Sequence, residues 1–144
     1  DGPRERQLSE RDVMNVLKLV RSEYKIDPSR IYLMGHSMGG AGTWSLAHRY
    51  PGVWAAIGPM SGTLSEADYD YAKLSKIPTI VGVGGLEGGL VTSSKAEVEA
   101  MKRLGTKTAY VEIEGGTHMS MIPPTVPKIL AFFAEQRKTS AKLP

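Results

Sequence analysis

A serine in the segment GHSMGG is the residue best suited to covalent chemistry. Ser37 lies in the pattern G-x-S-x-G, after an apolar run that predicts a strand and before a run that predicts a helix. Gly35 and Gly39 leave room for a sharp turn, which would expose the hydroxyl. The backbone N–H of Met38 and the positive end of the helix dipole would then stabilise an oxyanion. The pattern indicates a nucleophile; the alternative is a plain glycine-rich turn.

A serine hydroxyl is a poor nucleophile at neutral pH, so it needs a base, and the base needs an acid that fixes its tautomer. His118, in the segment EGGTHMS, follows the last predicted strand and is the expected base. The alternative for His118 is a solvent-exposed loop histidine. His36 adjoins the serine, and we expect it to orient the loop or contact substrate. Met119 is expected to contact substrate as well.

The acid should follow the third predicted strand, where the segment GVGGLEGGLV offers only Glu87. Chain order favours Glu87, because the sequence Ser, then acid, then His is one of the known triad orders. Asp68 and Asp70, in the segment EADYDY, are the alternative acids. An exposed loop carboxylate remains the non-catalytic interpretation of Glu87.

Other chemistry finds little support in the sequence. Acidic residues and the three histidines do not cluster at metal-ligand spacing, so we predict no metal site and no cofactor. Three methionines flank the proposed site and are expected to line an apolar acyl pocket, namely Met38, Met119 and Met121.

The elements that must position these groups alternate between strand and helix. Apolar runs predict four strands, at residues 30–35, 53–62, 77–85 and 107–116. Helical patterns cover residues 9–24, 37–50, 93–104 and 125–138. Strands that are apolar on both faces and alternate with helices predict an α/β fold with a parallel sheet covered on both sides. Loops at the carboxyl ends of such strands carry the chemistry, which singles out the loops around Ser37, after Met60, around Glu87 and around His118.

Two of the predicted helices have a distinct apolar face. The first, with Ser9 as its N-cap, has a stripe expected to be buried, formed by Val13, Leu17, Val20 and Tyr24. The last has a face formed by Ile129, Leu130, Phe132 and Phe133.

Composition limits the class of protein. The 144 residues suffice for one domain, 1–144, and their 41% hydrophobic and 23% charged content is typical of a globular protein. The net charge of +3 is spread over 18 basic and 15 acidic residues, so we expect neither a nucleic-acid nor a membrane partner. There is no cysteine, which leaves a cytoplasmic or a secreted location open. The start DGPRERQ has no methionine, so we expect an excised or processed chain.

The segment from DVMNVLKLV to GPMSG resembles the nucleophile half of α/β-hydrolases of the esterase, feruloyl-esterase, polyhydroxybutyrate-depolymerase and predicted-peptidase group. The segments KIPTIVGVGG and YVEIEGGTHMS resemble the acid and histidine segments of that group. The resemblance implies that Ser37 is the nucleophile and His118 the base. Members usually carry an aspartate where Glu87 stands, so the triad implied here is altered by one methylene.

The resemblance also implies that part of the usual sheet is absent. In the family about four strands precede the first helix, and one of their loops supplies a second oxyanion donor. This chain would then be a truncated α/β-hydrolase with about four strands, and the Met38 N–H would be the remaining donor. The strand at residues 30–35 would lie at an open edge. We expect this edge to be covered by the first helix, paired with a second copy in a homo-oligomer, or completed by a swapped segment.

These inferences predict a serine carboxylesterase that acts on small-molecule esters with short acyl or aryl groups. Two alternatives remain. One is a catalytically weak hydrolase fragment that acts as a binding or assembly module, and the other is a peptidase.

Overall fold

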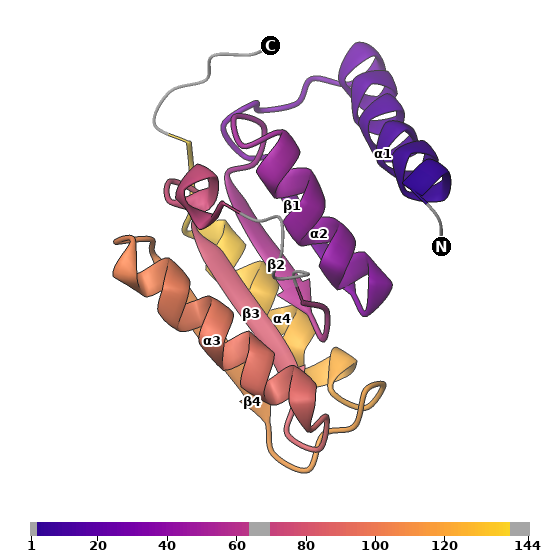
Figure 1. Cartoon of the computed structure of the whole chain (residues 1–144). Helices are drawn as coiled ribbons and strands as arrows, with labels where there is room; N and C mark the ends of the chain where they lie inside the picture. Colours follow the sequence, from indigo (N-terminus) through magenta and orange to yellow (C-terminus); the bar gives the residue numbers. More distant parts are fainter. Residues whose placement is uncertain (1–2, 64–69, 139–144) are drawn as a thin grey trace.

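A parallel four-stranded sheet forms the centre of the molecule (Figure 1). The computed structural model describes residues 3–63 and 70–138. The strands are β1 (Tyr32–His36), β2 (Ala56–Met60), β3 (Thr79–Gly84) and β4 (Thr108–Ile113), in the spatial order β1-β2-β3-β4. Every neighbouring pair is parallel, so all four carboxyl ends lie at one edge of the sheet. The predicted α/β class and parallel sheet are confirmed.

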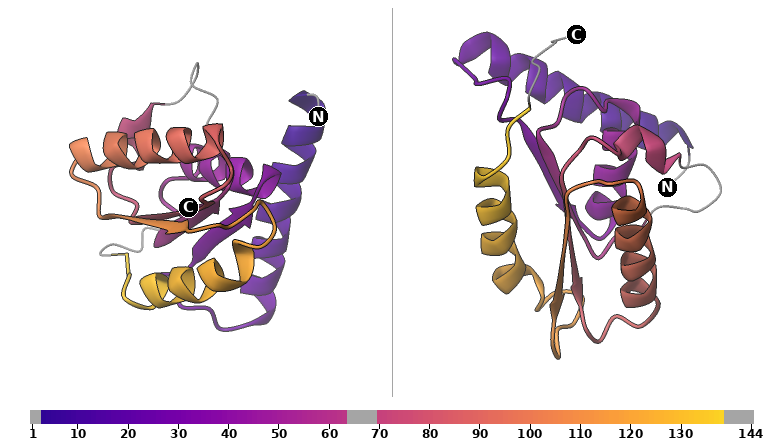
Figure 2. Two further views of the ribbon diagram at one scale, coloured as in Figure 1. Left: turned by 90° about the horizontal axis from the view of Figure 1, so that it is seen from below. Right: turned by 90° about the vertical axis from the view of Figure 1, so that its left-hand side faces the viewer.

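Helices cover both faces of this sheet (Figure 2). The helices are α1 (Pro3–Glu23), α2 (Met38–Arg49), α3 (Gly89–Arg103) and α4 (Ile122–Ala134), and a short 3-10 helix, η1, spans Tyr71–Leu74. The helices α2 and α3 lie on one face and α4 on the other, while α1 lies at the flank beside β1. Parallel strands need a crossover connection, and a helix is its usual form.

The two central strands build the core on both of their faces. Every residue of β2 and β3 is buried, as expected for strands covered by helices on both sides. Side chains alternate along each strand: Ile57 and Val81 pack with Trp44 of α2, whereas Ala56 and Ile80 belong to a second cluster under α4. This period of two divides the apolar core between the two faces.

The first helix differs from its prediction. It begins at Pro3, so Ser9 lies inside the helix and does not cap it. The predicted buried stripe is wrong, because Val13 is 38%, Val20 37% and Tyr24 64% exposed. Leu17 alone of that stripe packs against the core. The helix is attached by a different side, through Met14, Leu17 and the polar contacts of its Glu10 with Ser45 and Arg49 of α2.

The last helix is shifted toward the amino end of its predicted range. It begins at Ile122, and prolines occupy its first turn. N–H groups in the first turn have no acceptor within the helix, so the missing N–H of proline costs no hydrogen bond there. Ile129 and Phe133 are buried as expected, and the Phe133 ring stacks on Tyr32 with centroids 4.9 Å apart. Leu130, on the predicted apolar face, is 52% exposed, so that face is only partly covered.

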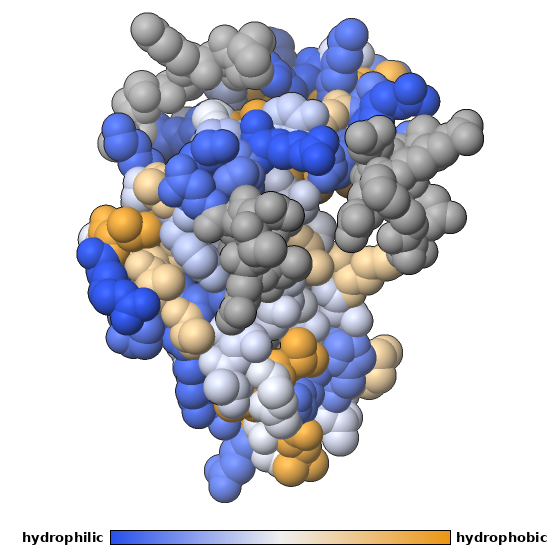
Figure 3. Space-filling model, viewed as in Figure 1, coloured by the Kyte–Doolittle hydropathy of each residue, from blue (hydrophilic) through white to orange (hydrophobic). Residues whose placement is uncertain are grey.

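The strand β1 lies at one edge of the sheet and is only partly covered. Its residues are half-buried or exposed, and Met34 is 40% exposed, although α1 lies at the same flank. On the face drawn in Figure 3, apolar residues form separate spots among polar ones. No helix in the described part of the chain is long and apolar enough to cross a membrane.

Candidate active site

The turn after β1 has the geometry that G-x-S-x-G predicts. Ser37 has φ of +57° and ψ of −118°, a conformation rare for a residue with a side chain, and its N–H donates to Met60 O at 2.8 Å. A Cβ on Gly35 would lie 2.2 Å from Gly39 O, so only glycine fits at Gly35. A Cβ on Gly40 would lie 2.5 Å from Met60 O, so Gly40 lets the first turn of α2 approach the end of β2.

The loops after β3 and β4 bring a carboxylate and an imidazole together. Glu87 lies in a turn closed by its own N–H, which donates to Gly84 O at 3.0 Å. The Glu87 side chain is 4% exposed, and its Oε1 lies 2.5 Å from His118 Nδ1. The alternative acid Asp70 caps η1 instead, with its Oδ1 accepting from Ala72 N at 3.0 Å. Asp68 lies outside the described residues.

The environment of Glu87 favours its ionised form. Burial by itself would raise the pKa of this carboxyl, but hydrogen bonds from Ser61, His118 and Gly84 outweigh it and hold the pKa below its ordinary value. An ionised carboxylate can only accept hydrogen bonds, so His118 Nδ1 must carry the proton. The lone pair of the neutral ring is then on Nε2, which is the tautomer that a general base requires.

His36 connects the start of the elbow to the histidine loop. Its Nε2 lies 2.7 Å from the carbonyl oxygen of His118, and the two rings are 4.4 Å apart between centroids. A carbonyl oxygen only accepts, so His36 must donate through Nε2. This bond ties the loop after β4 to the end of β1.

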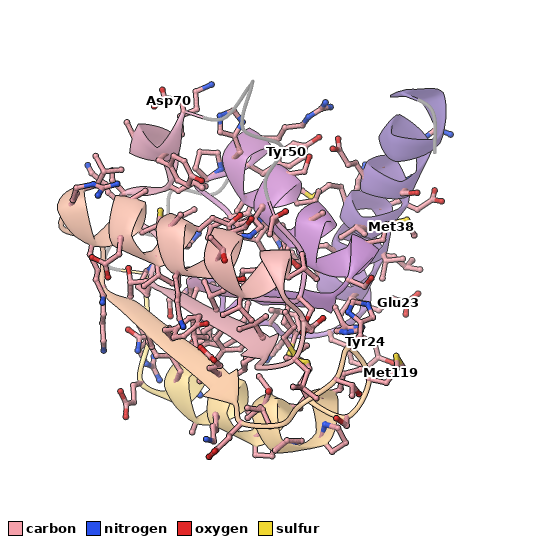
Figure 4. All side chains as sticks on the ribbon, turned by 60° about the horizontal axis from the view of Figure 1, so that its bottom comes forward. Glu23, Tyr24, Met38, Tyr50, Asp70 and Met119 are labelled. Atoms are coloured by element: carbon pink, nitrogen blue, oxygen red, sulfur yellow. The ribbon has the colours of Figure 1, made fainter. Side chains whose placement is uncertain are left out.

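The three methionines separate into two kinds of position. Met38 is 73% and Met119 65% exposed, and Figure 4 shows both at the same flank of the molecule. Met121 is fully buried in the cluster with Met60 and Ile129, so its predicted place in an acyl pocket is wrong. The N–H of Met38 is at the first position of α2, where helix geometry provides no acceptor.

One polar residue of this constellation was not predicted. Ser61 follows β2, is 3% exposed, and its Oγ donates to Glu87 Oε2 at 2.5 Å. The carboxyl-end rule had singled out the loop after Met60, but serine is too common in loops for its type to indicate a role. The four strands therefore each contribute one group at their carboxyl ends: Ser37, Ser61, Glu87 and His118.

Comparisons with known proteins place this chain in a family. A model of the PET hydrolase-like family matches residues 4–129. Cutinase 1 of Thermobifida cellulosilytica is 33% identical over 105 residues, covering 72% of this chain and 37% of the cutinase. A bis(hydroxyethyl) terephthalate hydrolase of Streptomyces coelicolor is 34% identical over 96 residues, covering 67% of this chain and 30% of that protein.

Solved structures show the same fold. A thermostable esterase matches with a TM-score of 0.78 and 27% identity, over 88% of this chain and 36% of that one. The esterase PE8 matches with a TM-score of 0.71 and 20% identity, over 90% of this chain and 61% of that one. The chain spans 37% of the cutinase and 36% of the thermostable esterase, so these comparisons concern one part of such proteins.

Proposed function

Since the chain belongs to the PET hydrolase-like family, we propose that it is a serine hydrolase that cleaves short-chain or aryl carboxylic esters through an acyl-enzyme. The observation that carries the proposal is the hydrogen bond of 2.5 Å between Glu87 Oε1 and His118 Nδ1, downstream of an elbow whose Ser37 has φ of +57°. Oriented base, buried acid and strained serine together are the combination that ester cleavage requires.

In this mechanism Ser37 Oγ attacks the ester carbonyl while His118 Nε2 takes its proton. The tetrahedral oxyanion accepts a hydrogen bond from the Met38 N–H, and the dipole of α2 adds to its stabilisation. His118 then gives the proton to the departing alcohol, which leaves an acyl group on Ser37. His118 Nε2 then takes a proton from water, which attacks the acyl group; the bond to Ser37 Oγ breaks, His118 returns the proton to Oγ, and the acid is released. Glu87 stays ionised and stabilises the imidazolium in both steps.

The substrate preference follows from the surroundings of the elbow. Met38 and Met119 expose flexible, polarisable side chains at the flank of the site, which suits aryl or short acyl groups. An amine is a poorer leaving group than an alcohol, so amide cleavage demands more stabilisation from the oxyanion donors. Esters are therefore favoured over peptides as substrates. The relatives named as cutinase and terephthalate-ester hydrolase support the ester class.

Hydrolysis of p-nitrophenyl acetate and butyrate tests the proposal, together with covalent labelling by a fluorophosphonate. We expect turnover and a label on Ser37, and loss of both in Ser37→Ala. Ser45→Ala is a matched control, since this serine lies in α2, the helix that Ser37 precedes, and bonds to Glu10 of α1. Absence of the label from Ser37 would contradict the nucleophile assignment.

A second candidate, a weakly active assembly module, is favoured by one observation. The edge strand β1 leaves Met34 40% exposed, and α1, which lies at the same flank, has exposed apolar side chains at Val13, Val16 and Tyr24. We propose that a second copy pairs with β1 in solution, because an exposed apolar edge is a template for strand pairing. Equilibrium sedimentation should show a dimer that Met34→Lys dissociates. A monomer at high protein concentration would contradict the pairing.

A further inference from the structure

Ser61 has a strained backbone held by its neighbours. Its φ is +45°, and Ser37 is the one other non-glycine residue with positive φ in the described part of the chain. The Ser61 N–H donates to Gly82 O at 2.8 Å, which fixes the backbone at the end of β2. Strain of this kind persists where surrounding contacts over-determine the conformation, and it clusters at functional sites. The position of Ser61 is therefore defined before its side chain is considered.

The Ser61 hydroxyl shares one oxygen of Glu87 with a backbone donor. Ser61 Oγ lies 2.5 Å and Gly84 N 2.6 Å from Oε2, while Oε1 faces His118 Nδ1 at 2.5 Å. Two donors on one oxygen fix the rotation of the carboxyl group about its last bond. The second oxygen is thereby directed to the imidazole.

A glutamate needs such a restraint more than an aspartate does. It has one more rotatable bond, and a shift of about 1 Å at a catalytic group can reduce the rate about 100-fold. Hydrogen-bond donors at either oxygen would be enough to satisfy a buried carboxylate. Here the Ser61 hydroxyl and the Gly84 N–H both donate to Oε2, the oxygen that does not face His118. The arrangement favours orientation over mere satisfaction.

We propose that Ser61 is a positioning residue for the acid of the triad: its hydroxyl holds the Glu87 carboxylate in the rotamer that presents Oε1 to His118. The inference rests on the proposed esterase function, which it deepens by a fourth residue. Ser61 acts through Glu87 and His118 and touches no reacting atom.

The kinetics of two variants separate the effect of the Ser61 hydroxyl on kcat from the effect of its strained backbone. Ser61→Ala removes the hydroxyl and keeps the Cβ, whereas Ser61→Gly removes the hydroxyl and relieves the positive φ. We expect kcat for p-nitrophenyl butyrate to fall about 10- to 100-fold in both, which is the effect of one hydrogen bond to a charged group, with KM within about twofold. Ser45→Ala, which removes the Ser–Glu bond at Glu10, is the matched control and should keep kcat. A kcat in Ser61→Gly equal to wild type would overturn the proposal.

A double-mutant cycle with Glu87→Gln tests whether Ser61 acts through the carboxylate. We expect Ser61→Ala to change kcat by less than about threefold in the Glu87→Gln background, because the group that it positions is already lost. A full and independent loss in that background would overturn the proposal.

A spectroscopic readout works without turnover. The proton on His118 Nδ1 should give a downfield resonance in the 1H NMR spectrum, identified by its loss in His118→Ala. We expect Ser61→Ala to shift or broaden this resonance while Ser45→Ala leaves it unchanged; an unchanged resonance in Ser61→Ala would overturn the proposal. Failure of the esterase function itself would appear separately, as absence of turnover and of a fluorophosphonate label in the wild-type chain.

Discussion

Glu87→Gln should abolish most of the activity although glutamine has nearly the same shape as glutamate. The reason lies in the two donors at Oε2, the Ser61 hydroxyl at 2.5 Å and the Gly84 N–H at 2.6 Å. The Ser61 hydroxyl can turn and accept a hydrogen bond, but the Gly84 N–H can only donate. A glutamine must therefore place its carbonyl oxygen at this point and its NH2 group at His118.

The NH2 group then donates to His118 Nδ1, so the ring proton moves to Nε2 and the ring can no longer accept the proton of Ser37. The opposite amide orientation leaves the buried Gly84 N–H facing another donor, at a cost of about 1–3 kcal/mol. An imidazole held in the wrong tautomer lowers kcat by about 10⁴ in other triads. At 1.36 kcal/mol per tenfold, that factor is about 5.4 kcal/mol of transition-state stabilisation.

The assay is kcat for p-nitrophenyl butyrate with Glu87→Gln, Glu87→Ala and Glu112→Gln. Glu87→Ala leaves His118 free to choose its tautomer, so we expect it to be no worse than Glu87→Gln. Glu112 of β4 forms an ion pair with Lys95 of α3 and accepts a hydrogen bond from Tyr110, so its substitution is the control and should keep kcat. If Glu87→Gln kept more than about a tenth of the wild-type kcat, the tautomer argument and the assignment of the acid would both be refuted.

Three further outcomes follow from the same contacts. Gly40→Ala should lower the melting temperature and the activity, because its Cβ would lie 2.5 Å from a backbone oxygen, whereas Gly42→Ala, with open space around it, should stabilise α2 by about 0.5–1 kcal/mol; equal melting temperatures would contradict this. The pKa of Glu87 is lower in the folded protein than its ordinary value of 4.5, so its ionised form stabilises the fold at any pH above 4.5. This stabilisation is lost as the pH falls below 4.5 and through the lower pKa of the folded state. Chemical unfolding between pH 6 and 3 should therefore show a steeper loss in wild type than in Glu87→Gln. His36→Leu should lower kcat about 3- to 10-fold by freeing the loop of His118, and an unchanged kcat would show that the loop holds itself.

The sequence was sufficient for the sheet and for the elements around the elbow because each of its signals is local. Short apolar runs bounded by proline or glycine define the strands, and G-x-S-x-G with a strand before it and a helix after it defines the turn at Ser37. The meeting of Glu87 with His118 was predicted from chain order and is present as a hydrogen bond. Their roles in catalysis remain predictions for the assays above.

What the sequence could not provide depends on partners distant in the chain. The stripe of Val13, Val20 and Tyr24 has the period of a buried helix face, and a period shows which side is apolar but not whether anything covers it. Met121 is polarisable and close to His118 in sequence, yet a single turn of the chain places it in the core under α4. Ser61 has a common residue type, and only its φ of +45° and its contact with Glu87 distinguish it.

The order of the strands explains why the histidine loop is the element on which the site depends. Neighbouring strands are about 4.8 Å apart, so the ends of β1 and β4 are separated by about 14 Å. A histidine at the end of β4 therefore cannot reach Ser37 unless its loop turns back across the sheet edge. Glu87, from the adjacent β3, meets His118 on this path, and the His36 bond to the His118 carbonyl oxygen at 2.7 Å fastens the loop to the end of β1. The two hydrogen bonds therefore hold the loop after β4 over the carboxyl edge of the sheet, where the proposed acid and base meet.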